Sequence, residues 1–137
     1  MLEVKNLKKT FKSGASVVRA VDDVSMKVGD GQFASIIGKS GSGKSTLLSL
    51  LGALDKPTGG SVIVGGEDIT KLRDRKLIAY RREKIGFIFQ NYNLVPNLTA
   101  EENVMLPMEF AGRPKNERVE RARKLLRAVG LDDDQFE

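Results

Sequence analysis

A glycine-rich octapeptide at residues 38–45 constrains the fold of this 137-residue chain more than any other feature. A short apolar run at residues 33–37 precedes it, and a helical pattern over residues 45–51 follows it. This order predicts a buried strand, a tight loop and a helix. Glycines at its first, fourth and sixth positions let successive backbone N–H groups turn inward toward an anion, and the helix adds its positive dipole end. The residues of the octapeptide are Gly38, Lys39, Ser40, Gly41, Ser42, Gly43, Lys44 and Ser45.

This spacing is that of a complete P-loop, which binds nucleotide phosphates. Lys44 would supply a compact charge for the β- and γ-phosphates, and the Ser45 hydroxyl would ligate Mg²⁺. The alternative is a flexible loop that matches by chance, and the flanking strand and helix patterns argue against it. A P-loop alone does not separate an ATPase from a GTPase or a small-molecule kinase. The guanine-binding tetrad Asn-Lys-x-Asp is absent, which argues against GTP as the ligand and leaves an ATPase and a small-molecule kinase open.

Composition limits the remaining chemistry. The hydrophobic share of 40% and the charged share of 30% are typical of a soluble globular protein. No apolar run approaches the roughly 18 residues that cross a bilayer, and the first residues lack a signal-peptide pattern, so we expect a chain that is neither inserted nor exported. Zero Cys and zero His leave lysines, hydroxyls, carboxylates, amides and the backbone as functional groups, which favours phosphate chemistry.

The rest of the chain predicts an α/β fold. Alternating polar and apolar residues indicate antiparallel strands at 2–11 and 17–28, and a turn precedes a short strand at 61–64. A second apolar run at 85–89 predicts another buried strand. A helix is expected at residues 71–82, with Leu72, Leu77 and Ile78 as its apolar contacts. A second helix is expected at residues 99–110, where Thr99 and Glu102 form a capping box. A third is expected at residues 116–129, where Gly130 ends the helix and one face is shared by Val119, Ala122, Leu126 and Val129.

The net charge of +5 comes largely from two basic stretches, residues 71–84 and 113–127. These stretches could face nucleic acid or anionic lipid. They are also typical of solvated helix faces, since acidic residues alternate with the arginines at helical spacing. No exposed aromatic pattern accompanies them, so we favour solvated faces and expect no nucleic-acid partner.

Three segments in this order and spacing resemble the ATP-binding subunits of ABC transporters: residues 38–46, residues 85–90 and residues 98–104. Residues 54–60 and 91–96 look most like the lipoprotein-release and macrolide-export branch of that family. The resemblance implies a P-loop NTPase core with an antiparallel β subdomain and the start of a helical subdomain, truncated before the signature motif. It divides the chain into residues 1–94 and residues 95–137.

The resemblance also implies further site residues. Phe11 stands where the family places an aromatic that stacks on adenine, and the less favoured alternative is an ordinary strand residue in the core. Thr46 would bond the α-phosphate. Gln90 matches the family's glutamine that reaches Mg²⁺ or the attacking water, so it would act with Lys44 in catalysis. Without the resemblance, Gln90 would be interpreted as an ordinary loop residue. Lys39 replaces the usual proline and would lie over the phosphates or point to solvent.

The implied partners are transmembrane permease subunits and a second ATP-binding subunit in a head-to-tail dimer, at the cytoplasmic face of the cell membrane. The acidic strand end, the switch histidine and the signature Leu-Ser-Gly-Gly-Gln of the family are absent. We therefore interpret the chain as an N-terminal piece of a longer ATPase that binds ATP weakly, hydrolyses it negligibly and self-associates through an exposed sheet edge. The alternatives are a soluble ABC-type ATPase that acts on ribosomes or DNA, and a non-catalytic nucleotide-binding fragment.

Overall fold

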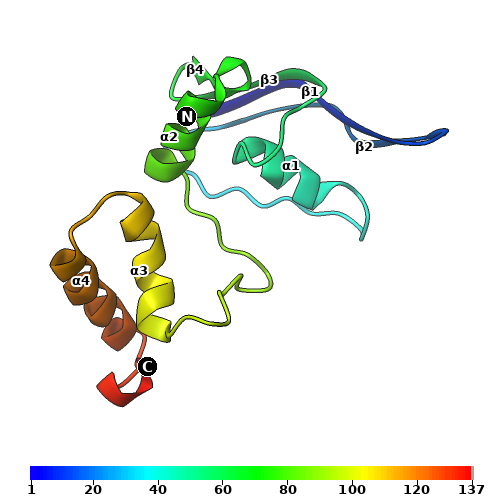
Figure 1. Cartoon of the computed structure of the whole chain (residues 1–137). Coiled ribbons are helices and arrows are strands. Elements are labelled where there is room, and N and C mark those ends of the chain that lie inside the picture. Colours follow the sequence, from blue (N-terminus) through cyan, green and yellow to red (C-terminus); the bar gives the residue numbers. More distant parts are fainter. Residues whose placement is uncertain (137) are drawn as a thin grey trace. The chain divides into compact units, whose positions relative to one another are not determined.

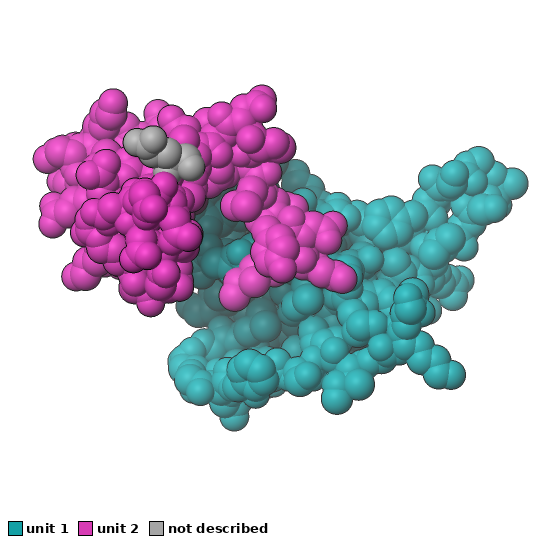
Figure 2. Space-filling view, turned by 90° about the horizontal axis from the view of Figure 1, so that it is seen from below, with its two compact units in different colours: residues 1–87 teal, residues 88–137 magenta. Residues whose placement is uncertain are grey.

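The computed structural model describes residues 1–136, which form two compact units, residues 1–87 and residues 88–136 (Figure 2). The subdomain boundary expected after residue 94 stays a prediction. No helix among the described residues has the length and apolar character of a membrane span.

A four-stranded antiparallel sheet forms the frame of the first unit (Figure 1). Its strands are β1 (Leu2–Ser13), β2 (Ser16–Val28), β3 (Gly59–Val64) and β4 (Glu67–Asp68), in the order β2-β1-β3-β4. The long β1–β2 hairpin and the short β3 confirm the strands that alternation predicted. Their antiparallel pairing lets one face pack against helices while the other meets water.

A bulge at Asn6 explains how β1 keeps two core residues three positions apart. Val4 pairs with Met26 and Leu7 pairs with Val24, so the register shifts between them. Asn6 takes a left-handed backbone with φ 46°, and its N–H donates to the Ser25 hydroxyl at 2.8 Å. The extra residue of a bulge restores the inward direction of the next side chain, so both Val4 and Leu7 are buried.

Two helices cover the sheet, α1 (Lys44–Leu51) and α2 (Asp74–Lys84), and the 3₁₀ turn η1 (Ile69–Lys71) leads into α2. Burial of apolar side chains from these elements supplies the main stabilising free energy of the unit. The expected role of Ile78 as a core contact is wrong, since its side chain is 56% exposed, whereas Tyr80 is buried in its place. The core residues are Val4, Leu7, Val21, Leu47, Leu50, Ala53, Val62, Ile69, Leu77 and Tyr80.

The second unit contains the helices α3 (Ala100–Phe110) and α4 (Lys115–Ala128) and the 3₁₀ turn η2 (Asp133–Gln135). The predicted capping box is confirmed: the Glu102 N–H donates to the Thr99 hydroxyl at 3.2 Å, and the Thr99 N–H donates to the Glu102 carboxylate at 2.9 Å. These bonds satisfy N–H groups that the helix itself leaves unpaired, which fixes the start of α3.

The buried face of α4 is shorter than its pattern predicted. Ala122 and Leu126 are buried, but Val129 is 73% exposed because it lies beyond the last helical residue, at the C-cap. Gly130 follows with φ 88°, and its N–H donates to the Arg127 carbonyl at 3.0 Å. This left-handed end confirms Gly130 as the stop of the helix.

The two expected buried strands are wrong for the chain as described. Residues 33–37 and 85–89 have no strand assignment, and Figure 1 draws both as loops. Phe33, Ile37 and Ile88 are 97%, 92% and 100% exposed. A parallel strand needs neighbouring strands for its ladder and covering elements for its faces, and residues 1–136 place no ladder partner beside either segment.

Candidate phosphate-binding site

The loop at residues 38–45 turns through two left-handed glycines and ends at a helix N-terminus. Gly41 has φ 77° and Gly43 has φ 85°, a region that side chains rarely adopt. Gly43 is the N-cap of α1, makes no side-chain cap bond, and precedes a first turn without acidic residues. The first N–H groups of α1 therefore have no partner within the helix and, with the helix dipole, favour an anion.

Close packing against β2 fixes the position of this helix start. An added Cβ at Gly43 would lie 1.9 Å from the Ala20 carbonyl oxygen, which is far inside van der Waals contact. Ala20 lies in β2, in the region where β2 pairs with the second half of β1. The absence of a side chain at Gly43 thus lets the loop rest directly on the hairpin.

Lys44 folds back over the loop. Its Nζ donates to the carbonyl oxygens of Gly38 at 2.8 Å and Lys39 at 2.7 Å, and the Ser42 N–H donates to the Lys39 carbonyl at 3.2 Å. An added Cβ at Gly38 would lie 2.6 Å from the Ser42 Oγ, a contact that rotation of the Ser42 side chain could relieve. The ammonium consequently lies beside the backbone of the loop, and it could form a strong charge-assisted bond to a phosphate bound there.

The remaining loop side chains leave room for a ligand. Ser40, Ser45 and Lys39 are exposed, Thr46 is half-buried, and none of their side chains forms a hydrogen bond or ion pair within residues 1–136. Mg²⁺ prefers oxygen ligands and commonly keeps several waters while it bridges substrate phosphates. An open hydroxyl at Ser45, beside a phosphate cradle, fits such an ion. No cluster of acidic residues that could hold a metal alone occurs in the described part of the chain.

Phe11 lies on the exposed part of the β1–β2 hairpin, paired with Val18, and its side chain is 45% exposed. The alternative of a core strand residue is therefore not supported. Phe11 pairs with Val18 of β2, and Ala20, whose carbonyl lies against Gly43, is two residues further along the same strand. Gln90 lies in an exposed turn of the second unit, and its role at the metal stays a prediction.

Sequence reasoning missed Lys9, which joins Phe11 to the end of the P-loop helix. Its Nζ donates to the Asp55 carboxylate and to the Lys56 carbonyl, both at 2.7 Å, and lies 5.0 Å from the centre of the Phe11 ring. The only sequence signal for the contact with Phe11 is that Lys9 and Phe11 are two residues apart on one strand. No local pattern predicts the pairing with Asp55.

The bond from Lys9 lowers the pKa of Asp55 below its ordinary value of 3.8; partial burial opposes this shift, and the Lys56 N–H assists it. A carboxyl group with a lowered pKa stabilises the fold at pH values above its ordinary pKa. This stabilisation disappears as the pH falls through the lowered pKa. We therefore expect Asp55→Asn to destabilise the chain at neutral pH, with a gap from the wild type that shrinks between about pH 5 and pH 3.

Urea unfolding at several pH values measures this gap. Asp134→Asn is the control, because Asp134 is exposed and forms no ion pair within the described residues. A gap between wild type and Asp55→Asn that stays constant over this pH range would contradict the assignment.

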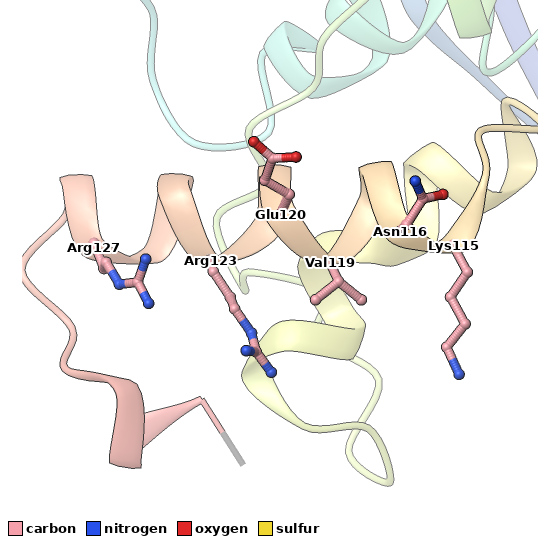
Figure 3. Close-up of a pocket in the computed structure, with 6 residues that line it drawn as sticks. All are labelled: Lys115, Asn116, Val119, Glu120, Arg123 and Arg127. Atoms are coloured by element: carbon pink, nitrogen blue, oxygen red, sulfur yellow. The ribbon is translucent and has the colours of Figure 1, made fainter.

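The basic stretch on α4 carries partly paired charges. The Arg123 Nε lies 2.5 Å from the Glu101 carboxylate, and Arg127 bonds Asp133 through Nε and Nη2, both at 2.7 Å. A shallow surface hollow along α4 is lined by Lys115, Asn116, Val119, Glu120, Arg123 and Arg127 (Figure 3). These pairings support the interpretation of α4 as a solvated helix face.

Comparison with known proteins identifies the family. The model of the family described as ABC transporter matches residues 21–137. An uncharacterized ABC transporter ATP-binding protein of Thermotoga maritima is 50% identical over 133 residues, which is 97% of this chain and 57% of that protein. A macrolide export ATP-binding/permease protein MacB of Yersinia pestis is 47% identical over 97% of this chain and 20% of its own length. The chain thus spans little more than half the length of the Thermotoga protein and about a fifth of the MacB protein.

Solved structures agree with this result. The ATP-binding cassette MJ0796, in a dimeric post-hydrolysis state bound to ADP and Pi, has a TM-score of 0.90 and 42% identity over 99% of this chain and 60% of that chain. A second dimeric structure of MJ0796, titled a bacterial ABC transporter cassette, has the same TM-score and 43% identity. These likenesses confirm the α/β class and the incomplete cassette expected from the sequence. The chain therefore belongs to the ABC transporter family, as part of its ATP-binding domain.

Proposed function

We propose that this chain binds Mg-ATP through residues 38–46 and that the longer protein uses ATP binding and hydrolysis to drive transport across a membrane. The observation that carries the proposal is the open N-terminus of α1, with the Lys44 ammonium held over it by two loop carbonyls. A triphosphate would take the place of these weak neutral acceptors and receive stronger, charge-assisted bonds.

Each loop group has a separate task in this proposal. The N–H groups of Gly41, Gly43, Lys44 and Ser45 hold phosphate oxygens, and Lys44 neutralises charge on the β- and γ-phosphates. The Ser45 hydroxyl would hold Mg²⁺, which would supply positive charge against the phosphates, and Thr46 would bond the α-phosphate. Phe11 stacks on adenine through its exposed ring surface.

The relatives support the wider role. MacB is named as an ATP-binding/permease protein, and MJ0796 is described as dimeric. We propose that this chain likewise works beside a membrane permease and a second ATP-binding unit, on the cytoplasmic face of the membrane. Gln90, after the segment 85–89, would sense the metal or the attacking water and transmit the nucleotide state to the permease.

We expect the 137-residue chain alone to bind Mg-ATP weakly and to hydrolyse it negligibly. It contains no His, and the first turn of α1 has no carboxylate that could polarise a water beside Ser45. Equilibrium dialysis with labelled ATP measures binding, and release of inorganic phosphate measures turnover. Steady turnover in material free of contaminating ATPase, lost on Lys44→Ala, would contradict this expectation.

A further inference from the structure

The ammonium of Lys9 is held more rigidly than most charged groups on the surface of a strand. The Lys9 side chain is only 12% exposed, and its Nζ has two acceptors at 2.7 Å, the Asp55 carboxylate and the Lys56 carbonyl. Lysine normally keeps its ammonium in water on a mobile stem. Two short bonds therefore fix this ammonium in one place.

The fixed ammonium lies against Phe11. The 5.0 Å from Nζ to the ring centre is within the roughly 6 Å range of a cation–π contact. An exposed phenylalanine on a hairpin would otherwise sample several staggered side-chain positions. Lys9 favours the one position in which the ring faces the ammonium, and the ring stays 45% exposed for another contact.

The acceptors of Lys9 belong to the segment that follows the P-loop helix. The N–H groups of Leu54 and Asp55 donate to the Ser49 carbonyl in α1, at 2.8 and 3.4 Å, so Asp55 is joined directly to this helix. One contact chain thus runs from the Phe11 ring through Lys9 and Asp55 to the helix whose first residues form the phosphate cradle.

We propose that Lys9 is a positioning residue that sets the Phe11 ring at a fixed place relative to the P-loop, so that base stacking and phosphate binding act together on one nucleotide. This inference rests on the proposed binding of ATP. A prepositioned ring loses less side-chain freedom when adenine stacks on it, which raises affinity for a nucleotide without a direct contact from Lys9.

Binding of ATP and of inorganic tripolyphosphate, compared in the full chain by isothermal titration, tests the proposal, because tripolyphosphate carries the phosphates without a base. Lys9→Met keeps the length of the stem and removes the charge. We expect it to weaken ATP binding roughly 3- to 10-fold and to leave tripolyphosphate binding unchanged. Lys9→Arg should retain most of the affinity for ATP. The matched control is Lys12→Met, which removes an equal charge beside Phe11 from an exposed side chain without an ion pair among the described residues.

A Phe11→Leu background separates the possible results. The inference is supported if Lys9→Met weakens ATP binding in the wild type and has no further effect beside Phe11→Leu. It is overturned if Lys9→Met weakens both ligands equally, has the same effect in both backgrounds, or has no effect. If Phe11→Leu leaves the ratio of the two affinities unchanged, the stacking role of Phe11 fails and the role of Lys9 fails with it. If the wild type binds neither ligand, the proposed function itself is contradicted.

Discussion

Replacing Lys44 by alanine should weaken ATP binding by roughly 100-fold or more. The ammonium can donate to two phosphate oxygens, and hydrogen bonds to charged groups contribute about 1.5–3 kcal/mol each. A loss of about 3 kcal/mol of binding free energy raises the dissociation constant by slightly more than 100-fold. The fold should tolerate the change, because among residues 1–136 the Lys44 ammonium bonds only the carbonyls of Gly38 and Lys39.

Isothermal titration with Mg-ATP measures the change in affinity for Lys44→Ala, and circular dichroism checks that α1 remains folded. The control is Lys124→Ala, which removes an equal charge from α4, where Lys124 is exposed and forms no ion pair within residues 1–136. Equal losses of affinity in the two variants would show that net charge, and not the loop lysine, governs binding.

Replacing Gly43 by alanine should lower the free energy of unfolding by about 2–5 kcal/mol. A left-handed backbone at φ 85° costs a residue with a Cβ about 1–2 kcal/mol. The new methyl group would also lie 1.9 Å from the Ala20 carbonyl oxygen, and overpacking of this kind costs about 1–3 kcal/mol more. The loop must then move away from β2, so nucleotide binding should fall as well.

Gly41→Ala is the matched control for Gly43→Ala. Gly41 has a similar φ of 77°, but a Cβ there would meet nothing within 4 Å, so only the backbone cost of about 1–2 kcal/mol is expected. Urea unfolding of both variants measures the difference. Equal destabilisation would contradict the close contact between the P-loop and β2.

Local patterns were sufficient to predict the elements whose partners are near in the chain. The hairpin of β1 and β2, the capping box at Thr99 and the left-handed stop at Gly130 each depend on neighbours within a short stretch of sequence. The turns at Gly41 and Gly43 and the start of α1 were predictable for the same reason, since the glycines act through their own backbone and Lys44 bonds carbonyls only five and six residues away.

Features that depend on distant segments could not be derived in this way. The apolar runs at 33–37 and 85–89 have the composition of buried strands, yet a strand forms only where another strand offers a ladder, and residues 1–136 offer none to either run. Lys9 shows the opposite case: its partner Asp55 lies 46 residues away, so the contact is visible only in the folded chain.

The central claim is that residues 38–46 hold the phosphates of ATP, and backbone amide chemical shifts test it most directly. On titration of the ¹⁵N-labelled chain with Mg-ATP, the largest shifts should occur at the amides of Gly41, Gly43, Lys44 and Ser45, because these N–H groups would exchange solvent for phosphate oxygens. Lys44→Ala should reduce those shifts at the same ligand concentration. Unchanged loop amides, with shifts confined to other parts of the chain, would contradict the account.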